Sequence, residues 1–236
     1  MGIVFITGAN RGLGLEFVKE FSKIDYEVIA TCRDPNSSSD LTTLAQSSLK
    51  IQLHQLDVSN TKNIQDLSKH LKNKPIDILI NNAGIYRSGS FNSVNKDSWV
   101  ESFITNTIGP YEVIEHFLPN VLQGREKKVI SITSKMGSID DNTSGGSYIY
   151  RSSKTALNSM MRSLTHDLKN HDIATMTLHP GWVRTDMGGP GGWIDVKESV
   201  SGMIDQILNL SIQNTGRYID YEGKPIKWWG IKKAFR

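Results

Sequence analysis

Short apolar runs alternate with helix-length amphipathic segments along nearly the whole chain, and this alternation limits the possible fold more than any other feature. Helices are expected over residues 12–23, 38–47, 61–72, 96–122, 148–170 and 196–210. Strands separated by helices favour βαβ units, and right-handed crossovers then give a doubly wound parallel sheet. The expected fold class is therefore α/β, with about seven strands and helices on both faces. The predicted strands are Ile3–Thr7, Glu27–Cys32, Lys50–Leu56, Ile76–Asn81, Lys127–Ser134, Ile173–Leu178 and Arg217–Ile219.

The composition is that of an ordinary globular protein, with 38% hydrophobic and 22% charged residues. The only cysteine, Cys32, excludes an internal disulfide and suits a reducing cytoplasm, which is the expected location. The net charge of +3 is too small to indicate a nucleic-acid partner, and the Lys127-Lys128 and Lys232-Lys233 pairs are interpreted as solvated ends. No apolar run approaches the length of a membrane span, and no signal peptide is recognised, so no membrane partner is expected.

No low-complexity linker or internal repeat divides the sequence, so one domain over residues 1–236 is expected. Two loop-rich stretches are expected within it as substrate loops, at about 137–147 and 186–196. The second contains Gly188-Gly189-Pro190-Gly191-Gly192, which suits neither a helix nor a strand.

A glycine-rich loop follows the first predicted strand and precedes the first predicted helix. Its glycines are spaced G-x3-G-x-G. Residues without a Cβ let the backbone approach a pyrophosphate at a helix N-terminus, where free N–H groups and the helix dipole attract anions. A tight turn with one helix-packing glycine is the alternative. The expected dinucleotide contacts are Gly8, Asn10, Arg11, Gly12, Leu13 and Gly14.

The end of the second predicted strand indicates which nucleotide is preferred. NAD-binding chains usually have an acidic residue here, which holds the ribose hydroxyls. This chain has Cys32 followed by Arg33, and Arg11 would face the same region. Two guanidinium groups suit a 2′-phosphate, whereas Asp34 precedes Pro35 and is expected to turn away as a cap. NADP(H) is therefore favoured over NAD(H).

Polar and small residues end the next two predicted strands. Asp57, beside Val58, could bind an adenine amino group or cap the helix that starts near residue 60, and both roles could coexist. The segment Asn81-Asn82-Ala83-Gly84 could be a plain loop, but it also suits packing against a ribose. Asn82, Ala83 and Gly84 are therefore candidate cofactor contacts.

A second group of polar residues points to proton transfer. Tyr150 and Lys154 share one helix face at i, i+4 spacing, and the lysine charge is expected to lower the tyrosine pKa toward the working range. Ser134 ends an apolar strand and could donate a hydrogen bond to a substrate carbonyl. Asn106 lies among apolar residues, just before Gly109-Pro110, which is expected to bend the helix. This asparagine is either a satisfied core amide or a residue that holds a water by freeing a backbone carbonyl.

With these motifs in one order, the chain resembles the short-chain dehydrogenase/reductase family of the small single-domain type, which has a Rossmann-like fold. Within the family, His179–Gly189 and Gly216–Asp220 resemble segments of C-factor-like and sniffer-like carbonyl reductases. The matching elements are Thr7-Gly8-x3-Gly12-x-Gly14, Asn81-Asn82-Ala83-Gly84, Asn106, Ser134, Tyr150-x3-Lys154 and Pro180-Gly181-Trp182-Val183-Arg184-Thr185.

The resemblance implies a catalytic tetrad. Tyr150 would be the acid/base, Ser134 the carbonyl orienter, Lys154 the pKa modulator and ribose ligand, and Asn106 the water holder. Pro180, Gly181, Val183 and Thr185 would bind the cofactor, with Val183 and Thr185 at the nicotinamide carboxamide. No metal site is expected, since His166 and His171 are five residues apart and His179 stands alone before Pro180.

The implied activity is NADPH-dependent reduction of a ketone or aldehyde to an alcohol. The alternatives are an NAD(P)-binding regulatory or signalling protein of C-factor type, and an epimerase or dehydratase, for which 236 residues leave no room for a larger substrate domain. Ser134 and Tyr150 are sixteen positions apart, against about thirteen more often in the family, so the substrate does not transfer from relatives. Tyr148 is followed four residues later by Ser152, which has no charge to offer. An uncharged, moderately hydrophobic small carbonyl is expected, with Tyr86, Phe91, Trp182 and Trp193 as walls.

The family also implies self-association. Equivalent long helices commonly pair about a two-fold axis, so the segments 96–122 and 148–170 are expected to form a homodimer or homotetramer surface. Their outer faces are predicted to include Phe117, Leu157, Met161 and Leu164; the alternative is that these four side chains pack on the sheet.

Overall fold

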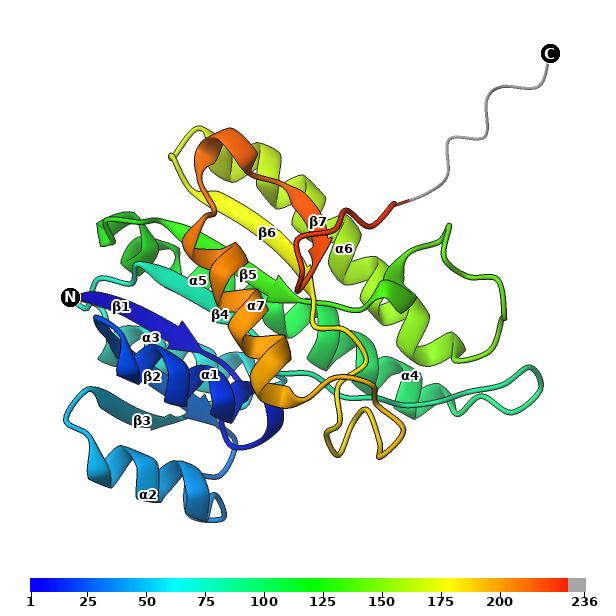
Figure 1. The fold of residues 1–236 in the computed structure, drawn as a ribbon, viewed down its shortest axis with the longest axis horizontal. Helices are drawn as coiled ribbons and strands as arrows, with labels where there is room; N and C mark the ends of the chain where they lie inside the picture. The colour runs from blue at the N-terminus through cyan, green and yellow to red at the C-terminus, as the bar shows by residue number, and fades with distance from the viewer. Residues whose placement is uncertain (229–236) are drawn as a thin grey trace.

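The computed structural model describes residues 1–228, in which seven parallel strands form one sheet (Figure 1). The strand order is β3-β2-β1-β4-β5-β6-β7. The chain therefore moves outward from β1 to one edge and then restarts on the other side of β1, which confirms the predicted doubly wound sheet. The strands are β1 (Gly2–Ile6), β2 (Tyr26–Cys32), β3 (Ile51–Gln55), β4 (Ile78–Asn81), β5 (Lys128–Ile132), β6 (Ala174–His179) and β7 (Arg217–Asp220).

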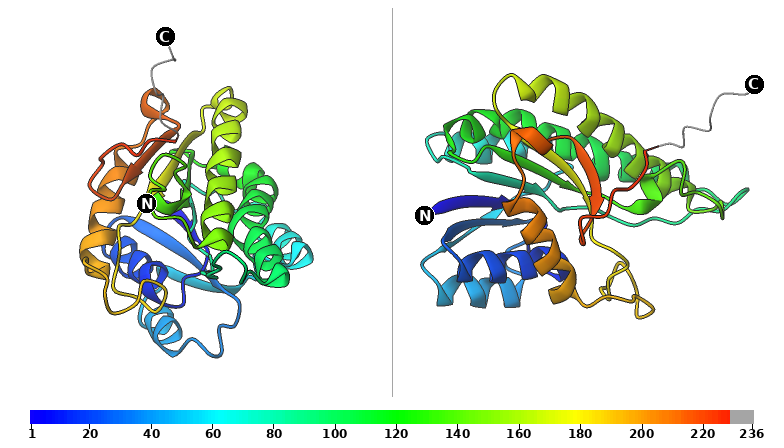
Figure 2. Two further views of the ribbon diagram at one scale, coloured as in Figure 1. Left: turned by 90° about the vertical axis from the view of Figure 1, so that its right-hand side faces the viewer. Right: turned by 45° about the horizontal axis from the view of Figure 1, so that its top comes forward.

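Helices cover both faces of this sheet, and Figure 2 shows the two layers. One layer contains α1, α2 and α7, whose apolar side chains share a core with one face of the strands. The other contains α3, α5 and α6 over the opposite face. The helices are α1 (Gly12–Lys23), α2 (Ser39–Ser47), α3 (Thr61–His70), α4 (Lys96–Phe103), α5 (Gly109–Gln123), α6 (Tyr148–Lys169) and α7 (Val196–Leu208), with short turns η1 (Ile104–Ile108), η2 (Lys135–Gly137) and η3 (Ile212–Asn214).

Because helices cover both faces of the sheet, the central strands have mostly apolar side chains on both sides. Every residue of β1 and of β5 is buried, as expected for parallel strands with helices on both faces. The same packing corrects the predicted outer surface of the long helices. Phe117, Leu157 and Met161 are buried in the core beneath α5 and α6, and Leu164 packs against it, so these four side chains do not form an outer face.

The predicted 96–122 helix is present but has a π-helical turn, η1, between α4 and α5. Asn106 lies in this turn, and Gly109 follows it. A Cβ on Gly109 would lie 2.3 Å from the carbonyl oxygen of Val58, so only glycine lets the helix approach the end of β3 this closely.

Two lysine pairs were predicted to be solvated, and for Lys128 this is wrong. Its side chain is buried, and Nζ donates to Glu126 Oε2 at 2.7 Å and to the Leu208 carbonyl at 2.9 Å. The ammonium group therefore holds the start of β5 to the end of α7. The Lys232-Lys233 pair lies outside the described residues.

The loops after β4, β5 and β6 leave the sheet at one edge, on the right in Figure 1, where the carboxyl ends of the strands lie. In doubly wound sheets this edge is where ligands bind. Within residues 1–228, no helix is long and apolar enough to cross a membrane, and no cluster of three potential metal ligands is found.

Candidate functional site

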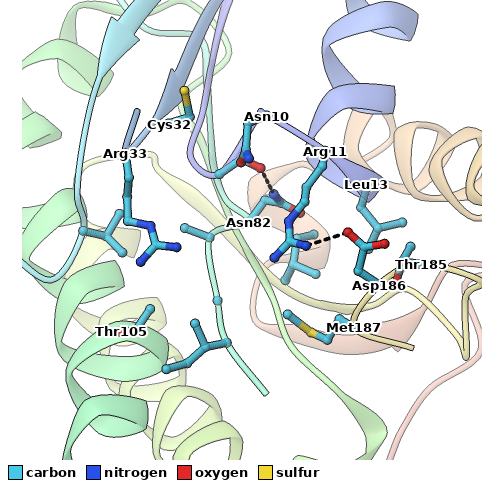
Figure 3. A pocket seen from close by; sticks show the side chains of 18 of the residues that line it. Asn10, Arg11, Leu13, Cys32, Arg33, Asn82, Thr105, Thr185, Asp186 and Met187 are labelled. Atoms are coloured by element: carbon cyan, nitrogen blue, oxygen red, sulfur yellow. Dashed lines mark hydrogen bonds and ion pairs between the residues drawn. The ribbon is translucent and has the colours of Figure 1, made fainter. Parts of the chain in front are cut away.

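A pocket of about 430 Å³ runs along the carboxyl edge of the sheet, from the end of β2 past the glycine loop to the start of α6. Figure 3 shows the part of it between Arg33 and Met187. Most of the predicted cofactor residues line it, although they come from distant parts of the sequence. The predicted residues in its lining are Gly8, Asn10, Arg11, Gly12, Leu13, Gly14, Arg33, Asp57, Val58, Asn82, Ala83, Gly84, Tyr150, Lys154, Pro180 and Thr185.

The glycine loop has the backbone that its sequence predicts. Gly8 and Gly12 adopt φ angles of 66° and 53°, in the left-handed region that favours glycine. A Cβ on Gly14 would lie 2.1 Å from the Gly8 carbonyl oxygen, so this residue allows the helix to start against the loop. The first turn of α1 has no side-chain cap and no acidic residue, which leaves its N–H groups available to an anion.

Asn82 fixes this loop from the neighbouring strand. Its Nδ2 donates to the carbonyl oxygens of Thr7 at 2.9 Å and Gly8 at 3.0 Å. In return, Thr7 Oγ1 accepts from the backbone N–H groups of Asn82 and Ala83, each at 3.0 Å. The polar and small residues after β4 therefore shape the glycine loop as well as lining the pocket.

Both predicted arginines lie in the pocket, but their environments differ (Figure 3). Arg11 Nη1 lies 2.5 Å from Asp186 Oδ2, and both side chains are mostly exposed. Arg33 makes no ion pair within residues 1–228. Arg33 is thus open to an anionic ligand, whereas Arg11 would have to exchange a carboxylate for it.

Two acidic residues near the arginines act in turns. Asp34 Oδ1 accepts from the Asn36 N–H at 3.0 Å and so caps a turn, but Asp34 also lines the pocket, so the expectation that it turns away is wrong. Asp57 Oδ1 accepts from the N–H of Ser59 at 2.9 Å, whereas α3 is capped by Asn60, whose Oδ1 accepts from Asn63 N at 3.1 Å. The suggested helix-capping role of Asp57 is therefore wrong, and its carboxylate faces the pocket from a turn.

At the other end of the pocket, Tyr150 and Lys154 lie on the buried face of α6. Lys154 Nζ donates to the Ile132 carbonyl at 3.0 Å and lies 5.9 Å from the centre of the Tyr150 ring. Burial lowers the pKa of Lys154 to about 8. The lysine is thus held at the end of β5 by one carbonyl oxygen.

The expected lowering of the tyrosine pKa is not what the structure shows. Burial raises the pKa of Tyr150 to about 12, and the nearby Ser134 side chain opposes that rise only in part. The i, i+4 spacing in the sequence places a lysine near the phenol, but it does not reveal how deeply the phenol is buried. Here the loss of water around the phenol has the larger effect on its pKa. Tyr150 consequently keeps its proton at neutral pH.

The structure also places Ser134 and Asn106 beside this pair. Ser134, just beyond β5, lies near enough to Tyr150 to lower the pKa of the phenol, and its Oγ accepts from Met136 N at 3.2 Å. Asn106 is fully buried: Oδ1 accepts from Ile85 N at 2.8 Å, and Nδ2 donates to Ile85 O at 2.9 Å and to Ser153 Oγ at 3.0 Å. The side-chain amide of Asn106 therefore has protein partners for both its oxygen and its nitrogen. The π-helical turn that contains it replaces the usual i→i−4 backbone hydrogen bonds of an α-helix at this point.

The segment after β6 is only partly in the pocket. Pro180 and Thr185 line it, and Thr185 Oγ1 accepts from Gly188 N at 3.0 Å. Gly181 and Val183 are absent from its lining within the described chain. Val183 is buried, and a Cβ on Gly181 would lie 2.3 Å from Ile194 Cδ1, so these two residues pack the loop against itself.

Several lining residues were not predicted as cofactor contacts. Asp186 and Met187 directly follow the predicted residue Thr185, and Thr105 directly precedes the predicted residue Asn106, so these positions could have been inferred from their neighbours. Glu101 is next to no predicted site residue. The unpredicted set is Cys32, Asp34, Ser37, Leu56, Ser59, Ile85, Glu101, Thr105, Ile132, Thr133, Arg184, Asp186, Met187 and Val196.

The predicted aromatic walls lie in two places. The Tyr86 ring packs against Tyr150, with centroids 4.8 Å apart. Trp182 and Trp193 contact each other at 5.1 Å in the loop after β6. Phe91, in the loop after β4, is 78% exposed. Tyr86 is thus the one of these four side chains that touches the Tyr150–Lys154 pair in the described structure.

The fold and this pocket define the class of protein: a doubly wound α/β protein with a glycine loop, a tyrosine–lysine pair and a serine at one sheet edge. Residues 2–191 match the short chain dehydrogenase family. The chain belongs to this family, and it is an oxidoreductase of the short-chain dehydrogenase/reductase type.

Three known proteins illustrate the similarity. The C-signal protein of Myxococcus xanthus is 43% identical over 157 residues, which cover 65% of this chain and 93% of that protein. The carbonyl reductase Sniffer of D. melanogaster is 33% identical, with a TM-score of 0.92, and the match covers 97% of this chain and all of that one. An NADPH-bound carbonyl reductase from chicken fatty liver is 34% identical, with a TM-score of 0.89 and the same two coverages.

Proposed function

We propose that the protein is an NADPH-dependent reductase that converts a ketone or aldehyde to an alcohol. The observation that carries this proposal is that Tyr150 and Lys154 lie buried one helical turn apart on α6, in the pocket that begins at Arg33, with Ser134 just beyond the end of β5. The similar solved proteins named carbonyl reductases support the same activity.

The residues of the pocket fit a dinucleotide. The uncapped N-terminus of α1, with Asn10, Leu13 and the loop glycines, would hold a pyrophosphate. Arg33 and Arg11 would bind a 2′-phosphate, and Asp57 with Val58 would contact the adenine end. Asn82, Ala83 and Gly84 would contact a ribose, with Lys154 as its ligand. Pro180 and Thr185 would lie at the nicotinamide end; for Val183 and Gly181, contact would require the loop to rearrange, since both lie outside the pocket lining.

The chain's own residues would move the proton. NADPH supplies the hydride to the carbonyl carbon when it is bound. Ser134 would donate a hydrogen bond to the carbonyl oxygen, and Tyr150 would transfer its phenolic proton to that oxygen. The Lys154 ammonium would then stabilise the phenolate, because an opposite charge favours the ionised form. Asn106 would keep the backbone of its turn open to a water that links Lys154 to solvent.

The direct test is a panel of uncharged ketones and aldehydes with NADPH, read by the absorbance of the reduced nicotinamide. Reduction of at least one compound, lost in Tyr150→Phe, is expected. No reduction across aromatic and aliphatic members would contradict the proposal. The Tyr86 ring, which packs against Tyr150, favours compounds with an apolar or aromatic group. The Trp182–Trp193 pair would favour the same compounds, with the loops at 137–147 and 186–196 bordering the substrate.

NADPH is expected to bind more tightly than NADH, because position 32 has no acidic side chain and Arg33 is unpaired in the described structure. The double variant Cys32→Asp, Arg33→Ala should reverse the preference, since a carboxylate repels a 2′-phosphate and accepts from ribose hydroxyls. Fluorescence titration of both cofactors measures this. Arg125→Ala, at the opposite end of the sheet, is the control. Tighter NADH binding by the unmodified protein would contradict the prediction.

A regulatory role is the second candidate, and the observation that favours it is the similarity to the C-signal protein. A chain that binds NAD(P) without turnover would be expected to have lost a member of the tetrad. Asn106, Ser134, Tyr150 and Lys154 are all present and adjacent, which favours catalysis. Cofactor binding with no turnover on the whole panel would favour the regulatory role.

We also propose that the protein works as a single domain in the cytoplasm and forms a homodimer or homotetramer. With the predicted apolar residues buried, the surface that remains is the exposed stripe Val100, Ile108, Tyr111 and Leu122 along α4, η1 and α5. Light scattering at micromolar concentration should give at least twice the chain mass of 26.4 kDa, and Ile108→Glu should reduce it. A mass near 26.4 kDa for the unmodified protein would exclude the dimer.

A further inference from the structure

The turn that carries Ser134 is held by side chains that lie outside the pocket. This turn, residues 133–138, links β5 to the loop before α6. Ser134 and Tyr150 belong to different elements, so the distance between their hydroxyl groups depends on how the turn is attached to α6. Two buried polar side chains hold the turn, Asn158 from α6 and Tyr218 from β7.

Asn158 binds the turn on both sides of Ser134. It lies on the same face of α6 as Tyr150 and Lys154, one turn after the lysine, and it is 2% exposed. Its Oδ1 accepts from Thr133 Oγ1 at 2.6 Å, and its Nδ2 donates to the Gly137 carbonyl at 3.2 Å. Thr155 Oγ1 donates to the same carbonyl at 3.0 Å. The helix that carries Tyr150 therefore holds the residue before Ser134 and the residue three after it.

Tyr218 holds Ser134 itself. Its hydroxyl donates to the Ser134 carbonyl oxygen at 2.7 Å, and the residue is 3% exposed. Burial raises the pKa of Tyr218, so the hydroxyl keeps its proton and remains a donor. The ring lies 5.0 Å from that of Trp228, and Ile226 N donates to the Tyr218 carbonyl at 2.8 Å.

The segment that covers Tyr218 also reaches the turn. Ser138 Oγ donates to the Lys227 carbonyl, and Ile139 N donates to the Trp228 carbonyl at 3.2 Å. The turn is thus fixed from α6, from β7 and from the chain after β7. Such contacts limit the movement of a hydroxyl whose donor geometry decides its contribution to a transition state.

We infer that Asn158 and Tyr218 are positioning residues that keep the Ser134 hydroxyl in reach of the substrate oxygen and Tyr150. This inference rests on the proposed carbonyl reduction, and neither residue lines the pocket in the described structure. It concerns how the serine is held and is independent of which carbonyl compound is reduced.

The test is a double-mutant cycle between Tyr218→Phe and Ser134→Ala. Tyr218→Phe removes one hydroxyl and keeps the ring against Trp228. In the native background it should lower kcat about 10- to 100-fold, with a smaller change in KM, because misplacement of a group near the reacting atoms costs that order. In the Ser134→Ala background it should change kcat by less than about twofold, because the hydroxyl that it positions is gone.

Thr165→Val is the matched control. It also removes a buried hydroxyl on α6, one that bonds to Thr175 Oγ1 at 2.7 Å, away from the Ser134 turn. It should lower thermal stability without changing kcat. Asn158→Leu should act as Tyr218→Phe does, with a larger loss of stability because two bonds are lost.

Hydrogen exchange provides a readout that needs no turnover. Tyr218→Phe should speed exchange at the amides of Gly137 and Ser138, which bond within the turn, and leave those of β1 unchanged. Equal effects of Tyr218→Phe in both backgrounds, or unchanged exchange at the turn, would overturn the inference while the reductase assignment stands. If the unmodified protein reduced no carbonyl compound, the proposed reductase function would be wrong, and the positioning role would be wrong as well.

Discussion

Replacement of Tyr150 by phenylalanine is expected to lower kcat by about 10²–10⁴-fold while NADPH still binds. Phenylalanine keeps the ring between α6 and Tyr86 and removes only the phenolic proton. Since burial raises the pKa of Tyr150 to about 12, the native phenol is protonated at neutral pH and can serve as the acid in reduction. Without it, the developing alkoxide has no acid within reach.

Tyr148→Phe is the control for this substitution. Tyr148 is two residues earlier on the same helix, but its side chain is exposed and lies outside the cofactor pocket. It should keep near-normal kcat. If Tyr150→Phe retained the activity of the unmodified protein on the same compound, with cofactor binding intact, the assignment of the acid would be wrong.

Lys154→Met is expected to remove most turnover and to weaken NADPH binding, yet to make the protein more stable at neutral pH. Burial lowers the pKa of Lys154 from 10.5 to about 8, so the folded protein penalises the charged form. A shift of this size corresponds to about 3 kcal/mol, offset in part by the bond to the Ile132 carbonyl. The melting temperature should therefore rise by about 5 °C.

The stability gain of Lys154→Met should depend on pH, because the charge that the substitution removes depends on pH. Because the pKa of Lys154 is lowered in the folded state, the cost of burying its charge is fully present below about pH 8 and disappears as the pH rises to 10.5. Lys154→Met should thus gain most below pH 8, and the gain should shrink between pH 8 and 10.5. Lys135→Met, at an exposed lysine paired with Asp141, should show neither effect. Lower stability of Lys154→Met at pH 7 would contradict the assigned cost of burial.

The sheet and most of the pocket could be predicted because their causes are local in sequence. Apolar runs with helices between them give parallel strands, and glycines between a strand and a helix give the loop with positive φ at Gly8 and Gly12. Spacing also placed Tyr150 and Lys154 on one face. Desolvation depends on the neighbours that folding brings in, so the raised tyrosine pKa could not be predicted from spacing alone.

Contacts between distant residues were harder to predict. Asp186 pairs with Arg11 across 175 positions, and nothing near either residue indicates the other. The burial of Phe117 and Leu157 was missed because an amphipathic helix pattern shows that a face is apolar but not what covers it. The sequence around Lys128 likewise does not show that its ammonium group binds the distant Leu208 carbonyl, because that contact forms only when α7 packs beside β5.

The loop at 137–147 has a consequence for how the protein can change over evolution. It begins at the Gly137 carbonyl, which accepts from Thr155 and Asn158, and it ends where Tyr148 N donates to the Gly89 carbonyl at 3.1 Å. Since both ends are anchored, and Ser138 and Ile139 also bind the chain after β7, residues beyond Ile139 can be inserted or exchanged without displacing Ser134 or Tyr150. The three residues that this chain has beyond the common spacing are therefore accommodated while the positions of Ser134 and Tyr150 stay constant.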